Sequence, residues 1–334
     1  MTALPASYPA LVVEHGEDES SPELRDLTAG EAGEGDVEIA VEWSSVNYKD
    51  ALAASPRGKV ARISPLVPGI DLVGRVLAGT GELGEGRQVL VHGYELGVAH
   101  HGGYAAYARV PADWVLPLPD GLSGRQAMAL GTAGFTAALS VQRLEDRGLS
   151  PQHGPVLVLG ATGGVGSTAV GILAERGYEV VASTGSDGEA FLREIGAAEV
   201  IARSETEQAG DRPLDRQRWA AVVDPVGGAS TAYALSTTRY AGAVALSGLT
   251  AGTGLETTVL PFILRSVSLI GIDSVQTPMD ERRRVWERLA GDLRPRGLDE
   301  AIAREVALAD VPGVLDALLA GEARGRTVVR VGEG

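Results

Sequence analysis

The chain has 334 residues, of which 44% are hydrophobic, so it is long enough for two domains with separate cores. Its formal net charge of −15 argues against nucleic-acid binding, because contacts to phosphates require a basic surface. The chain contains no cysteine, which excludes disulfides, thiolate catalysis and cysteine-ligated zinc.

The first 120 residues predict a β-rich domain. Short β-branched runs, broken about every ten residues by Gly, Pro or Asp, are typical of a partly open barrel. These runs are Leu11–Glu14, Val37–Trp43, Asp71–Leu77, Gln88–His92 and Tyr104–Val110. From Ser123 the pattern changes, and Arg125–Arg147 has helical periodicity with a glycine step at Gly131 to Gly134.

Strands and helices then alternate, which predicts a doubly wound parallel sheet. The expected strands are Pro155–Gly160, Glu179–Thr184, Glu199–Ala202, Trp219–Asp224, Gly242–Ser247 and Val267–Ile272. The expected helices are Ser167–Arg176, Gly188–Ile195, Ala229–Thr237, Glu281–Leu293 and Val311–Ala320. A last strand, Arg326–Val331, can return to the first domain, which would make that domain discontinuous.

A glycine-rich turn follows the strand near residue 160, where the chain reads V-L-V-L-G-A-T-G-G-V-G (156–166). Gly160 permits a tight turn, Gly163 and Gly164 let the backbone approach a pyrophosphate, and Gly166 lets the helix pack on the strand. One extra residue departs from the usual G-x-G-x-x-G spacing. Because a strand precedes the turn and a helix follows it, we interpret it as a dinucleotide site rather than as a plain loop.

The tip of the second strand of this unit bears on the choice of nicotinamide cofactor. It reads Ser183-Thr184-Gly185-Ser186, with no carboxylate before Asp187 to accept a hydrogen bond from the ribose of NAD. Hydroxyls, turn N–H groups and Arg203 favour the 2′-phosphate of NADP. The alternative is a solvated turn with Arg203 on the surface. The segment 224–228, D-P-V-G-G, follows another strand, and we favour a cofactor contact there over a plain turn.

Polar residues in the first domain are candidates for chemistry. Asn47-Tyr48-Lys49-Asp50 follows a predicted strand, and the Tyr48 hydroxyl can donate a proton or a hydrogen bond to a developing oxyanion, oriented by Lys49 or Asn47. The alternative is a helix start in which Asp50 is solvated. Arg57, Lys59 and Arg62 can bind the phosphates of a nucleotide-like substrate, or form a solvated basic loop.

Several other features suggest no further site. Segments 68–71 and 100–105 are interpreted as turns that lead into strands. The five histidines show no H-E-x-x-H or H-x-H spacing, so no metal site is expected. No apolar run approaches the roughly 20 residues of a membrane helix. No basic segment followed by an apolar one opens the chain, so we expect a cytoplasmic protein without a membrane partner.

Read together, these segments resemble the medium-chain dehydrogenase/reductase superfamily in its zinc-independent quinone oxidoreductase branch. The resemblance is carried by S-S-V-N-Y-K-D-A-L-A (44–53), P-G-I-D-L-V-G (68–74), H-G-G-Y-A (101–105), G-T-A-G-F-T-A (131–137) and G-A-T-G-G-V-G (160–166). Further segments are similar to the bacterial acryloyl-CoA reductase group: D-P-V-G-G (224–228), T-T-V-L-P-F-I-L-R (257–265), G-I-D-S-V (271–275) and G-R-T-V-V-R-V (325–331).

The resemblance implies an α/β protein with a GroES-like catalytic domain (1–121 and 276–334) and a Rossmann NADP-binding domain (122–275). It implies a homodimer in which edge strands such as Val267–Ile272 pair. It places Asn47 and Tyr48 at the nicotinamide and substrate, as catalytic residues. It assigns NADPH binding to Thr132, Gly160, Thr162, Gly163, Gly164, Val165, Ser183, Thr184, Gly185, Ser186, Arg203 and Gly248. Relatives often carry Arg where this chain has Ser186, which weakens the NADP preference.

The implied activity is NADPH-dependent reduction of an activated C=C bond, with acryloyl-CoA converted to propanoyl-CoA. Hydride goes to the β-carbon and a proton to the α-carbon, with Tyr48 as first candidate donor and water as its rival. Arg57, Lys59 and Arg62 are expected to hold the CoA phosphates. The missing cysteines argue against alcohol oxidation by a zinc alkoxide. The alternatives are a quinone or enone oxidoreductase and a non-catalytic NADPH-binding protein.

Overall fold

A computed structural model describes residues 4–16, 20–56, 58–185, 187–207 and 212–332. The chain divides into two compact units. The first unit comprises residues 1–132, 275–284 and 303–334, and the second comprises residues 133–274 and 285–302. Two helices, α2 (Gly124–Asp146) and α7 (Met279–Ala290), contribute residues to both units.

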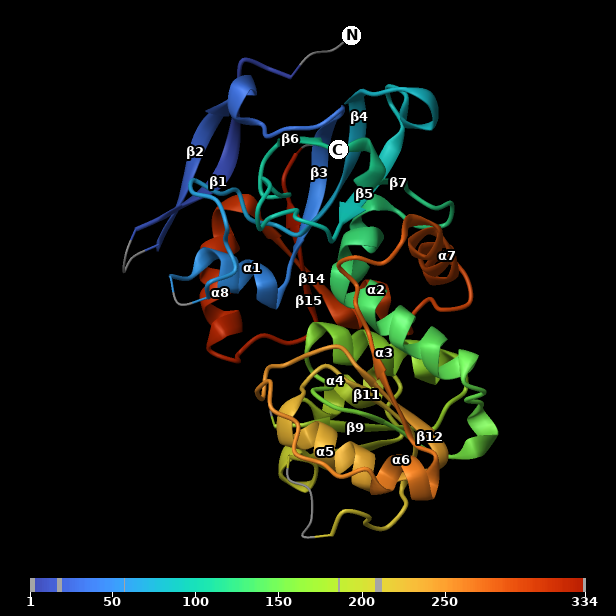
Figure 1. The fold of residues 1–334 in the computed structure, drawn as a ribbon. Helices are drawn as coiled ribbons and strands as arrows, with labels where there is room; N and C mark the ends of the chain where they lie inside the picture. Colours follow the sequence, from blue (N-terminus) through green and yellow to red (C-terminus); the bar gives the residue numbers. More distant parts are fainter. Residues whose placement is uncertain (1–3, 17–19, 57, 186, 208–211, 333–334) are drawn as a thin grey trace. The chain divides into compact units, whose positions relative to one another are not determined.

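The first unit is built on a mixed sheet in which all pairs except β14 with β15 are antiparallel (Figure 1). Its strands are β3 (Val37–Val46), β4 (Asp71–Ala78), β5 (Gln88–His92), β6 (Tyr107–Val110), β7 (Val115–Pro117), β14 (Ala303–Ala307) and β15 (Arg326–Arg330). A separate hairpin pairs β1 (Ser7–His15) with β2 (Ser20–Thr28), and the helices are α1 (Tyr48–Ala54) and α8 (Val311–Leu319). Alternating apolar residues of β3, β4 and β5 form the core of the sheet.

The end of the chain returns to this sheet, as the sequence suggested. β15 pairs antiparallel with β3, with Thr327 opposite Val46 and Arg330 opposite Trp43. β14 pairs parallel with β15. The first unit is therefore discontinuous, and it brings Arg326 beside residues that lie near position 46 of the chain.

The second unit holds a parallel sheet in the order β10-β9-β8-β11-β12-β13. These strands are β8 (Val156–Val158), β9 (Val180–Thr184), β10 (Glu199–Ala202), β11 (Trp219–Asp224), β12 (Thr238–Leu246) and β13 (Ser268–Gly271). Helices α3 (Gly164–Glu175) and α5 (Gly228–Thr237) pack on it, and α4 (Glu189–Glu194) and α6 (Leu260–Arg265) complete the unit (Figure 1). The strand order reverses beside β8, as in the doubly wound sheet of dinucleotide-binding folds.

Single turns connect several of these elements. The 3₁₀ turns are Ala29–Glu31, Gly81–Leu83, Ala112–Trp114, Pro151–His153, Arg203–Glu205 and Leu308–Asp310, and a π turn covers Leu298–Ile302.

Apart from the single residue Val275, which lies in the first unit, the observed units differ from the predicted domain boundaries in two segments. Residues 122–132 lie in the first unit, and residues 285–302 lie in the second unit rather than in the first. Trp286 explains the second difference, because this fully buried ring lies 6.4 Å from the ring of Phe135 on α2, measured between centroids. An aromatic pair of this kind assigns the last part of α7 to the core of the second unit.

Candidate active site

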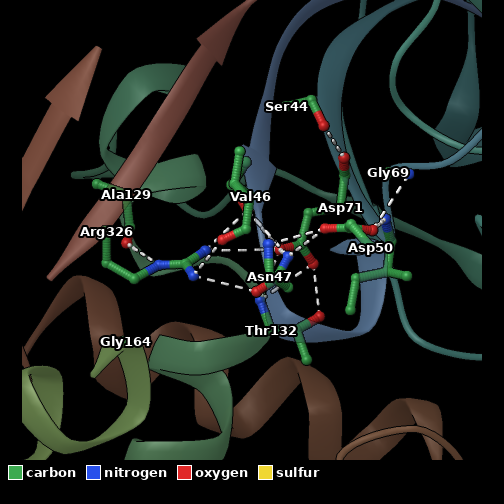
Figure 2. Close-up of polar contacts among 12 residues, drawn as sticks. Ser44, Val46, Asn47, Asp50, Gly69, Asp71, Ala129, Thr132, Gly164 and Arg326 are labelled. Atoms are coloured by element: carbon green, nitrogen blue, oxygen red, sulfur yellow. Dashed lines mark hydrogen bonds and ion pairs between the residues drawn. The ribbon is translucent and has the colours of Figure 1, made fainter. Parts of the chain in front are cut away.

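Polar side chains gather in the interior of the first unit, where they form hydrogen bonds and an ion pair with one another (Figure 2). We name them the buried polar cluster: Ser45, Asn47, Asp50, Asp71, Thr132 and Arg326. They come from the end of β3, the start of α1, the first residue of β4, the middle of α2 and the first residue of β15. All except Thr132 are buried. Such groups are stable inside a protein only when they satisfy one another.

Two members of the cluster bind the two sides of an interruption in α2. The helix is broken at Gly131, whose φ is 52° and ψ is −157°. The carboxylate of Asp71 accepts the backbone N–H of Thr132 at 3.0 Å and its hydroxyl at 2.5 Å. The Nε of Arg326 donates to the carbonyl of Ala129 at 3.0 Å. These bonds satisfy groups that a broken helix leaves without helical partners, and each charge suits the dipole of the segment it caps.

Asn47 is bound on every side by the cluster. Its amide nitrogen donates to Asp71 Oδ2 at 2.7 Å and lies 3.3 Å from Asp50 Oδ2. Its Oδ1 accepts from Arg326 Nη1 at 3.1 Å. Because both ends of the amide are engaged, the Asn47 side chain is held in one orientation, and the catalytic role expected for it stays a prediction.

A helix does start here, as the alternative interpretation held, but Asp50 is fully buried, so its expected solvation is wrong. Its Oδ2 accepts the backbone N–H of Asn47 at 2.8 Å, and its Oδ1 accepts those of Gly69 at 3.2 Å and Ile70 at 2.8 Å. Burial, followed by the negative charge of Asp71, raises the pKa of Asp50 to about 7. Protonation of Asp50 therefore falls in the neutral range.

The charge of Arg326 is balanced by these carboxylates. Burial lowers the pKa of Arg326, while the negative charges of Asp71 and Asp50 raise it. Its Nη2 donates to the Ser45 hydroxyl at 2.8 Å and lies 3.8 Å from Asp71 Oδ2. With Asp50 protonated, the cluster holds one positive and one negative charge, which is the balance that a buried ion pair requires.

Tyr48 directly follows Asn47 of this cluster and is the first residue of α1. It is 43% exposed, and no described residue hydrogen-bonds its hydroxyl. The cluster thus fixes the start of α1 through Asn47 and Asp50 and leaves the phenol of Tyr48 accessible. That arrangement suits a group that donates to a bound substrate.

The predicted phosphate-binding loop is only partly described. Arg57 lies outside the described residues. Lys59 is exposed and adopts a left-handed backbone conformation with a φ of 50°. Arg62 is exposed and pairs with Glu95 at 2.8 Å. An exposed pair of this kind contributes little to stability, so it leaves Arg62 able to exchange its partner for a phosphate.

The glycine-rich turn of the second unit has the geometry that a pyrophosphate needs. Gly160 has a φ of 56°, and a Cβ on Gly166 would lie 2.3 Å from the Gly160 carbonyl oxygen. Gly163 precedes α3, which begins at Gly164. The first N–H groups of α3 lack helical acceptors and lie at the positive end of the helix dipole, so they suit an anion. Val165, in the first turn, is partly exposed.

The tip of β9 differs from the expectation in one detail. The Ser183 hydroxyl is buried and lies 2.7 Å from Thr206 Oγ1, so it points into the unit. Thr184 Oγ1 lies 3.1 Å from Thr162 Oγ1, which joins this tip to the glycine turn. Ser186 lies outside the described residues.

Arg203 and Gly248 each approach another backbone closely. A Cβ on Gly185 would lie 2.5 Å from Nε and Cζ of Arg203, so the guanidinium rests against the glycine. A Cβ on Gly248 would lie 1.9 Å from the Pro225 carbonyl oxygen. A glycine at this position therefore lets the segment after β12 pack against the segment after β11. Both positions lie beyond the carboxyl ends of parallel strands, where ligands of such sheets bind.

The carboxylate of Asp224 closes its own turn. Its Oδ1 accepts the N–H groups of Val226 at 2.8 Å and Gly227 at 2.9 Å, and its Oδ2 accepts the Thr231 hydroxyl at 2.5 Å. Within the segment 224–228, a cofactor contact would therefore involve the backbone rather than the carboxylate of Asp224.

The sequence reasoning missed the roles of Asp71 and Arg326. Each is a charged residue that opens a strand with apolar residues close behind it, Leu72 and Val73 in β4 and Val328 and Val329 in β15, which is a signal of a buried partner. The spacing of Asn47 and Asp50 is that of a capping box, in which the third helical residue accepts from the N-cap backbone. This spacing was the available signal that Asp50 turns inward.

Two family models of dehydrogenases match the chain, one in its first part and one in its second part. Residues 33–120 match the family described as Alcohol dehydrogenase GroES-like domain, and residues 164–291 match the one described as Zinc-binding dehydrogenase. The chain is 48% identical to the acrylyl-CoA reductase AcuI of Ruegeria pomeroyi, over 97% of this chain and 99% of that protein.

Two solved structures share the complete fold. The yhdH oxidoreductase of Salmonella enterica in complex with NADP has a TM-score of 0.94 and 44% identity, and covers 97% of this chain and 100% of its own. The Bacillus subtilis protein yhfP with NAD bound has a TM-score of 0.95 and 47% identity, and covers 98% of this chain and 100% of its own. The name of YhfP assigns it provisionally to the quinone oxidoreductases.

The donor set of this chain does not match the zinc in the name of one matched family. The sequence has no cysteine, and the described ranges contain no group of His, Asp and Glu side chains arranged to hold a metal ion. Within those same ranges, no helix combines the length and the apolar character needed to cross a membrane. The chain belongs to the medium-chain dehydrogenase/reductase superfamily, in the quinone oxidoreductase branch that contains the acrylyl-CoA reductases.

Proposed function

We propose that this protein uses NADPH to reduce the activated C=C bond of acryloyl-CoA, giving propanoyl-CoA. The observation that carries the proposal is the 48% identity to an acrylyl-CoA reductase across 97% of the chain. A match of that extent covers both units, so it includes the residues for cofactor and for substrate. Fold alone would not support a substrate assignment.

NADPH, when bound, supplies the hydride that reaches the β-carbon of the substrate. The N–H groups of Gly164 and Val165 would hold its pyrophosphate, and Arg203 against Gly185 would hold its adenosine phosphate. The Gly163 N–H donates to the Gly160 carbonyl at 3.0 Å, so Gly163 would contribute by letting the backbone approach the pyrophosphate. Thr132 would contact its nicotinamide end. Gly160, Thr162, Thr184 and Gly248 would shape the same site through the turns they form.

The residues of the first unit would manage the charge and the proton. As the β-carbon is reduced, negative charge develops on the thioester oxygen, and a hydrogen bond from Tyr48 would stabilise it. The α-carbon then takes a proton from Tyr48 or from water. Asn47 and the rest of the buried polar cluster would hold Tyr48 in place. Lys59 and Arg62 would bind the CoA phosphates, together with Arg57.

An assay of NADPH oxidation tests the proposal. Acryloyl-CoA, a quinone and a blank without acceptor are compared, and propanoyl-CoA is identified as the product. Faster turnover with the quinone would favour the second candidate, which the name of YhfP supports. Binding of NADPH without turnover of either acceptor would indicate a non-catalytic binding protein.

We propose further that two copies of the chain associate through the second unit. β13 ends the parallel sheet, so one edge of it is available for pairing. Beside it, Ile263 and Leu264 of α6 are 67% and 59% exposed. Light scattering should show a dimer, and Ile263→Glu should give a monomer, whereas Leu319→Glu on α8 should not. A monomeric wild type contradicts the proposal.

NADPH and CoA thioesters are cytoplasmic metabolites, which supports a cytoplasmic location.

A further inference from the structure

A groove of about 570 Å³ runs along the tips of β9 and β10 in the second unit. The residues that line it include Thr184 and Gly185 from the end of β9 and Arg203 from the turn after β10. Three carboxylates line it as well, those of Asp187, Glu189 and Glu207. In doubly wound sheets this position receives the adenosine ribose of a dinucleotide.

Arg203 is the cation of this groove, and its place is fixed by the backbone. The guanidinium rests on Gly185, where a Cβ would come within 2.5 Å of Nε. In the part of the chain that the structure describes, no carboxylate lies within ion-pair distance of Arg203. Its charge is therefore available to a phosphate on the ribose.

The carboxylates differ in how far their charges are compensated. Glu189 pairs with Arg193 at 2.8 Å, four residues further along α4. Asp187 and Glu207 form no ion pair with any described residue. Among its described lining residues, the groove thus sets two negative charges without an ion-pair partner against the positive charge of Arg203.

We propose that Asp187 and Glu207 determine cofactor specificity in this protein. Their negative charges repel the 2′-phosphate of NADPH, and this repulsion reduces the preference of the protein for NADPH over NADH. The inference rests on the proposed function, because it takes this groove as the adenosine site. The two cofactors differ at that ribose position alone, which carries a phosphate in NADPH and a hydroxyl in NADH. A carboxylate repels the phosphate and accepts a hydrogen bond from the hydroxyl, while Arg203 attracts the phosphate.

The expected effect follows from Coulomb's law. One unit charge about 7 Å from a phosphate, in a wet groove, changes phosphate binding by about three- to tenfold. Loss of either carboxylate should therefore tighten NADP⁺ binding by that factor. NAD⁺, which has no charge at this position, should bind unchanged or more weakly.

Calorimetric dissociation constants of the full-length protein for NADP⁺ and NAD⁺ test this inference. Asp187→Asn and Glu207→Gln should each raise the ratio of NADP⁺ to NAD⁺ affinity about three- to tenfold, and Arg203→Ala should lower it. Glu205→Gln is the matched control, because Glu205 is an exposed carboxylate on the same turn as Arg203 but does not line the groove. Added salt should reduce each difference.

Failure of this inference and failure of the proposed function give different binding results. If NADP⁺ or NAD⁺ binds the wild type, but Asp187→Asn and Glu207→Gln leave the affinity ratio where Glu205→Gln leaves it, the inference is overturned and the proposed function stands. If neither dinucleotide binds the wild type, the proposed function fails and this inference fails with it.

Discussion

Arg326 and Asp71 meet at the interruption of α2, where the guanidinium bonds the carbonyl of Ala129 and the carboxylate bonds the N–H of Thr132. Their closest nitrogen and oxygen atoms are 3.8 Å apart, and both side chains are buried. The pair therefore joins the last strand of the chain to the start of β4 and to both segments of a broken helix. Every one of these contacts depends on a charge that water cannot reach.

Removing one partner should therefore destabilise the protein strongly. Arg326→Met leaves the Asp71 carboxylate without its buried countercharge, and the cost of breaking such a pair is about 3–5 kcal/mol. Urea unfolding measures it. Arg330→Met, at the other end of β15, removes an exposed partner of Glu305 and should cost far less. Equal losses for the two variants would show that the buried pair has no special weight.

The glycine at the break is the second test of this arrangement. Gly131→Ala places a Cβ 2.5 Å from Asp71 Oδ2 at a residue with a φ of 52°. Gly177→Ala also has a positive φ, 80°, but nothing lies within 4 Å of the added carbon. The Gly131 variant should lose about 1–3 kcal/mol more in urea unfolding, since it adds a steric conflict to the backbone strain. A difference near zero would mean that Asp71 moves aside without cost.

How far sequence predicts this molecule depends on how local the signal is. The parallel sheet was predictable, because its strands contain short apolar runs and helices follow β8, β9 and β11 in the chain. β2 and β14 were not predicted, because S-S-P-E-L-R-D-L-T and A-R-E-V-A carry polar residues that become strands only beside β1 and β15. The same holds for the buried polar cluster, in which Asn47 bonds a residue 279 positions away. No local pattern indicates which charge will meet which.

The pH dependence of stability should reveal Asp50. Its pKa of about 7 in the folded protein lies above the ordinary value of 3.8, so folding favours its protonated form. The resulting stabilisation is complete below pH 4 and is lost as the pH rises through 7, by at most about 1.4 kcal/mol per pH unit. Between pH 5 and pH 7, wild-type stability should therefore fall relative to that of Asp50→Asn.

Other groups that titrate in this range are common to both proteins and cancel in the comparison. Burial lowers the pKa of His92 and of His101, which favours their neutral forms and acts in the opposite direction, toward loss of stability at low pH. Unfolding curves at several pH values, taken for wild type and Asp50→Asn, measure the difference. Parallel curves would show that Asp50 keeps an ordinary pKa.

The basic loop should act on CoA rather than on the reacting bond. Replacing Arg57, Lys59 and Arg62 together with Ala should raise the KM for acryloyl-CoA about tenfold or more, since charge-assisted contacts to phosphate are lost. The KM for a small enone without CoA should not change. The single variant Glu95→Gln frees Arg62 from its 2.8 Å pair and should lower the KM for acryloyl-CoA slightly. Equal effects on both substrates would place the loop's role elsewhere.

Tyr48 is the residue whose chemistry is most open to a direct test. Its hydroxyl has no described partner in the protein, so Tyr48→Phe should leave the fold and the melting temperature unchanged. If the hydroxyl stabilises the developing charge on the thioester oxygen, kcat for acryloyl-CoA should fall by about 10²-fold or more. The affinity for NADPH should stay the same, because the phenol is assigned to the substrate. Tyr240→Phe, at a tyrosine that is 68% exposed on β12, is the control and should keep full activity. An unchanged kcat in Tyr48→Phe would assign the proton at the α-carbon to water and leave the phenol a role in substrate fit alone.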